Sequence, residues 1–388
     1  MDSMMFTLIR QAHVYAPKDL GIKDVLICND KIIAVEDSVT LDFSWDEQIT
    51  TIDGTLKYLV PGFIDQHVHI IGGGGEDGFA SLIPEIQMTD CIKAGVTTVV
   101  GLLGTDSNAK SIPALVAKTK ALKEQGISAF CLTGSYAYPS TTLTGSVSKD
   151  IAFVEEIIGV KIAISDHRSS NVSKEELARL ATQARTAGLL AGKPGVVHMH
   201  TGRGKIGYRD VLEIVKETDI PVSQFRPTHA GTQLESAFAF AEAGGMLDFT
   251  SGNDTKRTAQ LLAEVLKQVQ SDRVTLSSDS NGSFPIWNDK AEVIGMGIGK
   301  MTTLYQTIRD LIQIEKVPIE TALTLITKNV AKGLMQYPKK GCIARGSDAD
   351  LVLLDQALTI DSVIAKGVCM MREKQMLAKD YYNNLSRE

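Results

Sequence analysis

Several side chains that can bind a metal follow short apolar segments of the sequence. His67 and His69 form an HxH pair in FIDQHVHI, and because strand side chains alternate between two faces, both point to one side. His200 and His229 end two later apolar segments, and Asp279 ends a third. A single histidine at a strand end is usually structural, but this whole set is harder to explain in that way. Imidazole nitrogens with one carboxylate suit zinc or another first-row divalent metal, so the pattern predicts a metal centre.

Lys161 is unusual for its surroundings, because it lies within the apolar segment GVKIAIS. One interpretation is a lysine at a strand edge whose ammonium group reaches solvent along its aliphatic stem. The other is a buried lysine beside metal ions, which loses its proton readily and becomes nucleophilic. Addition of carbon dioxide to the neutral amine would then give a carbamate, an anionic ligand able to bridge two metals. Taken alone, the position of Lys161 favours the first interpretation, whereas a nearby metal centre would favour the second.

Eight short apolar segments alternate with stretches at helical spacing and must position these side chains. They are residues 63–70, 97–103, 128–134, 160–165, 195–200, 222–229, 246–251 and 274–280. Strands that alternate with helices form parallel sheets, and eight of them predict an α/β fold, a closed (β/α)₈ TIM-type barrel. An open doubly wound sheet is the alternative, and the lack of GxGxxG after the first segment weakens its dinucleotide-binding form. Barrel enzymes carry their active site at the C-terminal mouth, where the histidine-bearing segments end.

The segment HMHTG offers two histidines on the same side of one predicted strand, His198 and His200. We take His200 as the ligand because it lies nearer the C-terminal end of that strand. His198 is then expected lower in the barrel interior. His13 lies outside the predicted barrel, and His167 is interpreted as structural.

The two ends of the chain differ from the barrel region. Residues 1–59 and 339–388 carry short strand-like segments and no long helix, and neither end is long enough to bury a good core alone. We therefore expect a small β-domain assembled from both ends, with residues 60–338 forming the catalytic barrel.

Composition narrows the class of protein. The chain has 388 residues with 44% hydrophobic and 22% charged residues, and 40 basic against 46 acidic residues give a net charge of −6. No basic cluster stands out, which argues against nucleic acid and anionic membranes as partners. The start lacks a signal-peptide pattern, no apolar run approaches roughly 18 residues, and the five cysteines form no CxxC motif. A cytoplasmic protein with reduced cysteines is expected.

The motifs together resemble the amidohydrolase superfamily, and more narrowly the isoaspartyl (β-aspartyl) dipeptidases. PGFIDQHVH marks only the superfamily, whereas HVHIIGGGGE combined with ISDHRS is much more specific. The resemblance covers nearly the whole chain, through GVTTVVGLLGTDS, GSYAYPS, SSDSNGS and the closing GSDADLVLLD.

The resemblance implies a binuclear zinc site. His67, His69 and Asp279 would hold the first Zn²⁺, and His200 and His229 the second. Lys161, carrying a carbamate derived from CO₂, would bridge the two ions together with a hydroxide. Asp279 can take a proton from the attacking hydroxide and deliver it to the departing nitrogen.

The resemblance also assigns residues to the substrate. Gly74, Thr105 and Ser283 match positions that hold the α-carboxylate of the isoaspartyl residue, and Glu76 matches the residue that receives its α-ammonium group. Tyr136 matches a phenol that polarises the scissile carbonyl. Arg168 matches an arginine that binds the carboxylate of the leaving amino acid. Without the resemblance, Tyr136 would be taken as an ordinary half-buried tyrosine.

One position departs from the family pattern. The family usually has an arginine three residues after the histidine that is His229 here, and this chain has Thr232. Arg226 lies three residues before His229, and strand alternation turns it away from the side that His229 faces. One of two clamps for the leaving carboxylate is therefore in question.

A barrel with these residues is compatible with three functions. The first is a metal-dependent dipeptidase for β-aspartyl bonds, with a small dipeptide as substrate and a homo-oligomeric state implied by the resemblance. The second is a cyclic-amide hydrolase of the dihydroorotase or hydantoinase type, which would share the metal site but would not need Glu76 and the glycine run. The third is a metal-free scaffold, which predicts eroded ligands, whereas the predicted ligands are all present.

Overall fold

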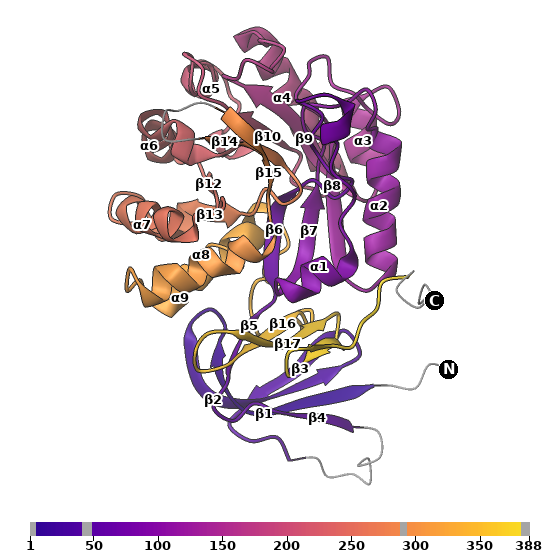
Figure 1. Cartoon of the computed structure of the whole chain (residues 1–388), viewed down its shortest axis with the longest axis vertical. Helices are drawn as coiled ribbons and strands as arrows, with labels where there is room; N and C mark the ends of the chain where they lie inside the picture. Colours follow the sequence, from indigo (N-terminus) through magenta and orange to yellow (C-terminus); the bar gives the residue numbers. More distant parts are fainter. Residues whose placement is uncertain (1–4, 41–48, 288–292, 382–388) are drawn as a thin grey trace.

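The computed structural model describes residues 5–40, 49–287 and 293–381. Within these ranges the chain forms a barrel of parallel strands with helices outside it, and a separate β-rich domain lies below the barrel in Figure 1. The predicted fold class, a TIM-type barrel with a β-domain built from both ends, is confirmed.

The barrel strands follow one another around the barrel in chain order. Six of them share one parallel sheet: β6 (Phe63–Val68), β7 (Val96–Gly101), β8 (Ser128–Gly134), β9 (Ile157–Ile164), β10 (Val196–Thr201) and β11 (Phe225–Thr228). The parallel pair β12 (Leu247–Thr250) and β13 (Val274–Ser277) completes the circle, since β12 lies beside β11. A parallel bridge between Val68 and Ser280 connects the end of β13 to β6. Each predicted apolar segment overlaps one of these strands, although residues 222–224 form a short 3₁₀ helix ahead of β11.

Helices cover the outside of the barrel. They are α1 (Met88–Lys93), α2 (Ile112–Glu124), α3 (Val147–Phe153), α4 (Lys174–Ala191), α5 (Arg209–Glu217), α6 (Leu234–Glu242), α7 (Thr255–Val265), α8 (Thr302–Gln313), α9 (Ile319–Thr324) and α10 (Lys328–Gly333). Every residue of β6, β7, β9 and β10 is buried. Parallel strands are covered on both faces, and this explains why the segments read as nearly continuous apolar runs.

The β-domain joins the two ends of the chain in one sheet. Its N-terminal strands are β1 (Phe6–Tyr15), β2 (Asp19–Cys28), β3 (Lys31–Glu36), β4 (Ile49–Asp53) and β5 (Tyr58–Pro61). Its C-terminal strands are β16 (Leu351–Leu354), β17 (Ile360–Ala365), β18 (Val368–Arg372) and β19 (Gln375–Met376). The junction is the antiparallel pair β5 and β16, in which Tyr58 faces Leu354 and Pro61 faces Leu351. Gly62 is the single residue between β5 and β6, so the sheet adjoins the barrel directly at this point.

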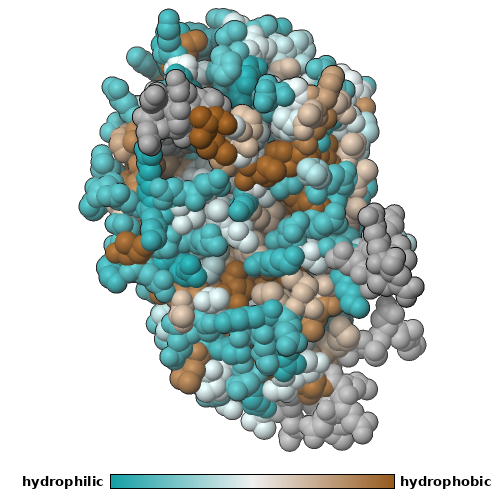
Figure 2. All heavy atoms as spheres, viewed as in Figure 1, coloured by the Kyte–Doolittle hydropathy of each residue, from teal (hydrophilic) through white to brown (hydrophobic). Residues whose placement is uncertain are grey.

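A hairpin of β14 (Ser283–Trp287) and β15 (Val293–Ile298) follows the last barrel strand and was not expected from the sequence. On the face shown in Figure 2, polar residues are widespread and hydrophobic residues form smaller patches between them. The five cysteines, all in the described part of the chain, are free. Among the described helices, none combines the length and the apolar character needed to span a membrane.

Candidate active site

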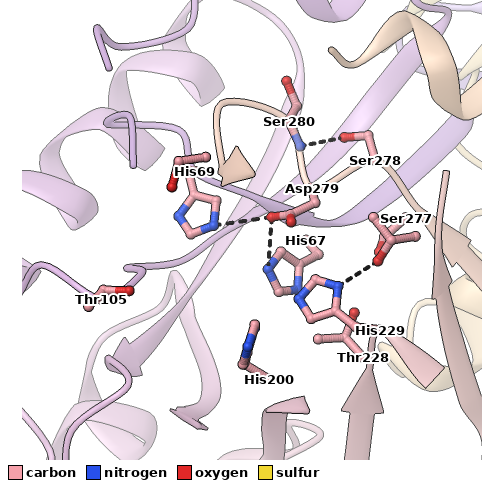
Figure 3. A network of polar contacts seen from close by, with 12 residues as sticks. His67, His69, Thr105, His200, Thr228, His229, Ser277, Ser278, Asp279 and Ser280 are labelled. Atoms are coloured by element: carbon pink, nitrogen blue, oxygen red, sulfur yellow. Dashed lines mark hydrogen bonds and ion pairs between the residues drawn. The ribbon is translucent and has the colours of Figure 1, made fainter. Parts of the chain in front are cut away.

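Three predicted metal ligands meet at the mouth of the barrel. Oδ1 of Asp279 lies 3.2 Å from Nε2 of His69 and 3.4 Å from Nε2 of His67 (Figure 3). One ligand atom of each side chain lies within 4.8 Å of the others, which makes the three residues a candidate metal site. Asp279 adopts a left-handed backbone conformation with φ of 54°, an uncommon one for a residue with a side chain. Such strained residues gather at functional sites.

The two further histidines lie beside this group. The ring centroids of His229 and His67 are 5.2 Å apart, and those of His229 and His200 are 4.6 Å apart. Nδ1 of His229 lies 2.6 Å from Oγ1 of Thr250, and His229 lines the cavity, so its Nε2 remains available to a ligand there. A bond of this kind fixes the tautomer and the orientation of a metal-binding histidine.

His200 has protein partners on both ring nitrogens. Its Nε2 lies 2.9 Å from Oδ2 of Asp166, and its Nδ1 lies 2.6 Å from the hydroxyl of Tyr136. Because an ionised Asp166 only accepts hydrogen bonds, Nε2 donates and Nδ1 accepts from the phenol. His200 would have to exchange one of these partners before it could bind a metal.

Asp166 was missed from the sequence, although it lies within the ISDHRS motif. Burial opposes its ionisation, but hydrogen bonds from His200 and Arg168 outweigh this and hold the pKa of Asp166 well below its ordinary value. Nε and Nη2 of Arg168 each lie 3.0 Å from a carboxylate oxygen of Asp166. Asp166 therefore holds both the histidine and the arginine in place.

Lys161 lies on β9, fully buried among the barrel strands. This contradicts the interpretation as a lysine that reaches solvent at a strand edge. Burial lowers the pKa of its ammonium group to about 7, against the opposing charges of Asp279 and Asp248. Its Nζ has no hydrogen-bond partner, an expensive state for a buried polar group. A buried amine that loses its proton readily and has no hydrogen-bond partner, near a set of metal ligands, fits a site that is completed by another group.

His198 is buried below the metal-binding group, as expected, but its contact was not foreseen. Its Nε2 lies 2.8 Å from Nδ1 of His67. His198 thereby fixes the ring of His67 with Nε2 facing Asp279. The remaining two histidines differ: His13 lies on β1 in the β-domain and contacts Asp19, whereas the side chain of His167 is largely exposed at the cavity.

A cavity of about 500 Å³ opens beside the metal-binding group. Its wall includes each predicted substrate residue, namely Gly74, Glu76, Thr105, Tyr136, Arg168 and Ser283. Glu76 is the centre of one contact set: Ser283 donates to it at 2.7 Å, Thr105 at 3.2 Å and Arg168 at 3.3 Å. Gly74 has φ of 83°, and a Cβ there would lie 2.3 Å from the carbonyl oxygen of Ser81. Only glycine fits this turn, which carries the chain to Glu76.

The surroundings of the two predicted catalytic groups set their protonation in opposite directions. Burial raises the pKa of Tyr136 well above its ordinary value, so this phenol stays protonated and can donate a hydrogen bond. Burial alone would also raise the pKa of Asp279, but the hydrogen bond from His69 and the neighbouring histidines lower it to about 2. At neutral pH Asp279 is therefore an anion that can bind a metal or accept a proton.

Arg226 lies away from this cavity, as strand alternation predicted. Its Nη2 donates to the carbonyl oxygen of Gly333 at 3.1 Å, and it lines two other cavities, both beside α10. Thr232 does line the large cavity, but its hydroxyl donates to the carbonyl oxygens of His229 at 2.9 Å and Thr201 at 3.1 Å.

A family model described as the amidohydrolase family matches residues 58–370, most of the chain. The chain belongs to the amidohydrolase family. The predicted resemblance to this superfamily is thereby confirmed.

Solved structures give a narrower likeness within the amidohydrolases. A beta-aspartyl dipeptidase from Fervidobacterium islandicum AW-1, in complex with the dipeptide beta-Asp-Leu, is 38% identical, with a TM-score of 0.90, covering 97% of this chain and 100% of that one. A D-hydantoinase from Thermus sp. has a TM-score of 0.69 at 16% identity, which shows the common fold alone. Among curated proteins, an L-hydantoinase from Paenarthrobacter aurescens is 21% identical over 93% of this chain and 87% of its own length.

Proposed function

We propose that this amidohydrolase cleaves the β-aspartyl (isoaspartyl) amide bond of dipeptides. The observation that carries the proposal is the place of Glu76, a carboxylate bound by Thr105, Ser283 and Arg168 on the wall of the cavity beside the metal-binding group. A β-linked aspartate presents its ammonium and α-carboxylate groups together beyond the scissile bond. Glu76 offers an acceptor for the ammonium group, which would replace the hydroxyls of Thr105 and Ser283 at this carboxylate. The released hydroxyls and the backbone N–H of Gly74 then offer donors for the substrate carboxylate. The 38% identity to a beta-aspartyl dipeptidase supports the same function.

The metal in this proposal is a pair of zinc ions. His67, His69 and Asp279 would hold the first, His200 and His229 the second, and a carbamate on Lys161 would be shared. The unpartnered Nζ of Lys161 and the unpartnered Nδ1 of His69 support a site that an additional group completes. Bound divalent metals supply a strong nucleophile from water at neutral pH and polarise an amide carbonyl.

The side chains of this chain would carry the proton and orient the substrate. Asp279, ionised at neutral pH, takes the proton of the attacking water and passes it to the departing nitrogen. Tyr136 remains protonated and donates a hydrogen bond to the oxygen of the scissile carbonyl. Arg168 binds the carboxylate of the leaving amino acid, because its planar guanidinium group matches a carboxylate.

Turnover of three substrates tests the proposal. The metal-loaded protein should hydrolyse β-Asp-Leu, and much more slowly α-Asp-Leu, in which the ammonium and carboxylate groups are placed differently. Dihydroorotate should not be hydrolysed. Comparable kcat/KM for α- and β-Asp-Leu would refute the proposal, and turnover of dihydroorotate alone would favour the cyclic-amide hydrolase.

Glu76→Gln should lower kcat/KM for β-Asp-Leu by about 10- to 100-fold, because a hydrogen bond to a charged group is worth about 1.5–3 kcal/mol. Asp77→Asn is the matched control, since Asp77 is the exposed neighbour of Glu76 and does not line the cavity. Steady-state kinetics on β-Asp-Leu separate the two variants. Glu76 has no part in recognition if its variant behaves like that of Asp77.

Arg226→Ala should leave KM for β-Asp-Leu unchanged, because Arg226 contacts Gly333 and lies outside the cavity. Arg168→Ala should raise KM about 10-fold or more, since it removes a charge-assisted bond to the leaving residue. Equal increases in KM for the two variants would identify Arg226 as a second clamp and overturn the present assignment.

The dipeptide is the partner that the proposal requires. A homo-oligomeric state, predicted from the resemblance, and a cytoplasmic location, predicted from composition, both stay predictions.

A further inference from the structure

A second arginine lines the cavity beside the metal-binding group. Arg203 lies in the loop between β10 and α5, close in sequence to His200, and is one of the residues that line the cavity together with Arg168. The sequence motifs assigned no role to Arg203.

The charges of the two arginines are satisfied to very different degrees. Arg168 makes two bonds to Asp166 and one to Glu76, so two carboxylates already share its guanidinium group. Arg203 is exposed, and no carboxylate of the described residues forms an ion pair with it. A carboxylate that enters the cavity therefore finds at Arg203 a positive charge that no protein carboxylate compensates.

The backbone on both sides of Arg203 is firmly held against the barrel. The N–H of Gly202 donates to the carbonyl oxygen of Ile164 at 3.2 Å, and the N–H of Gly204 donates to that of Ser165 at 2.6 Å. A Cβ at Gly202 would lie 2.5 Å from Oδ2 of Asp166, so the loop also packs closely on the residue that orients Arg168.

Thr232 and Gln233 hold the same loop from the opposite side. The Thr232 hydroxyl donates to the carbonyl oxygen of Thr201, and Nε2 of Gln233 donates to the carbonyl oxygens of Gly202 at 3.2 Å and Gly204 at 2.8 Å. The threonine at this position thus supports the loop that presents an arginine, although it supplies no cation itself.

We propose that Arg203 binds the carboxylate of the leaving amino acid, as the second cationic contact beside Arg168. This rests on the proposed function, which makes that carboxylate part of every substrate. It assigns to a loop arginine a specificity role that Arg226 cannot fill from its position beside α10.

The test compares β-Asp-Leu with β-aspartyl-leucinamide, in which a neutral carboxamide replaces the carboxylate. Arg203→Ala should raise KM for β-Asp-Leu about tenfold with little change in kcat, and should leave KM for the amide unchanged. Arg203→Lys should keep part of the preference for the carboxylate, because it retains the charge but not the planar fork. Lys205→Ala is the matched control, since it removes an exposed cation of the same loop that does not line the cavity.

Two different failures are distinguishable. In the first, the wild type hydrolyses β-Asp-Leu, but the Arg203→Ala protein still prefers β-Asp-Leu to the amide as strongly as the wild type, or its KM rises equally for both substrates. The proposed role of Arg203 is then wrong, and the proposed function stands. If the wild type hydrolyses neither β-aspartyl substrate, the proposed function itself is overturned, and the role of Arg203 with it.

Discussion

Asp279→Asn should leave the fold intact and remove nearly all turnover of β-Asp-Leu. Asp279 lies within 3.4 Å of two histidine nitrogens, and its pKa of about 2 keeps it ionised at neutral pH. Asparagine has the same shape but can neither carry the negative charge nor accept a proton from the attacking water. General acid–base catalysis is worth about 10²- to 10⁴-fold, and weaker metal binding adds to this loss.

The measurement is kcat together with metal content and thermal unfolding. Asp272→Asn provides the control, because Asp272 is an exposed aspartate in the turn just before β13, the strand that Asp279 follows. We expect this control to retain wild-type kcat. An Asp279→Asn protein that binds metal and keeps a tenth or more of wild-type kcat would contradict the role as proton shuttle.

Lys161→Ala should lose metal and activity together. The lysine is fully buried, and its unpartnered amine, with a pKa of about 7, is largely neutral above that pH and therefore nucleophilic enough to add carbon dioxide. Without it the histidines lack the anion that would be shared between the two zinc ions. Small carboxylates such as acetate should restore both metal content and turnover in part, because they can supply the missing oxygen ligand.

Thermal unfolding of metal-free Lys161→Met separates this loss from misfolding. Burial lowers the pKa of Lys161 to about 7 from 10.5, so the unfolded chain binds the proton more tightly and the amine opposes folding at neutral pH. Methionine removes this cost, and metal-free Lys161→Met should unfold at a higher temperature than metal-free wild type. The difference should shrink as the pH rises from 7 toward 10, because the unfolded chain then loses the same proton. Full metal content and turnover in either variant would refute the role of Lys161, as would electron density for an unmodified amine that points away from two bound metals.

Features that follow from local periodicity can be predicted from the order of the residues alone. Nearly continuous apolar segments marked the barrel strands because parallel strands are covered on both faces. Strand alternation brought His67 and His69 to one side and turned Arg226 away, since the side-chain period of a strand is two whatever surrounds it. The capping box of Ser173 and Glu176 at the start of α4 has the same local origin.

The pairing of these side chains, and which of them stay unpaired, depends on the folded chain and could not be predicted from the sequence. Glu76 and Ser283 are separated by 207 positions yet form a 2.7 Å hydrogen bond. His67 and His198 are separated by 131 positions, and their ring nitrogens lie 2.8 Å apart. Contacts of this range arise from closure of the barrel, which no local pattern encodes. The same closure buries Lys161 and lets Asp166 form hydrogen bonds with both His200 and Arg168. It also leaves the charge of Arg203 without a carboxylate partner among the described residues. Burial and charge compensation depend on all the residues that surround a side chain in the folded protein. They determine which of the two arginines still has an uncompensated charge for a carboxylate.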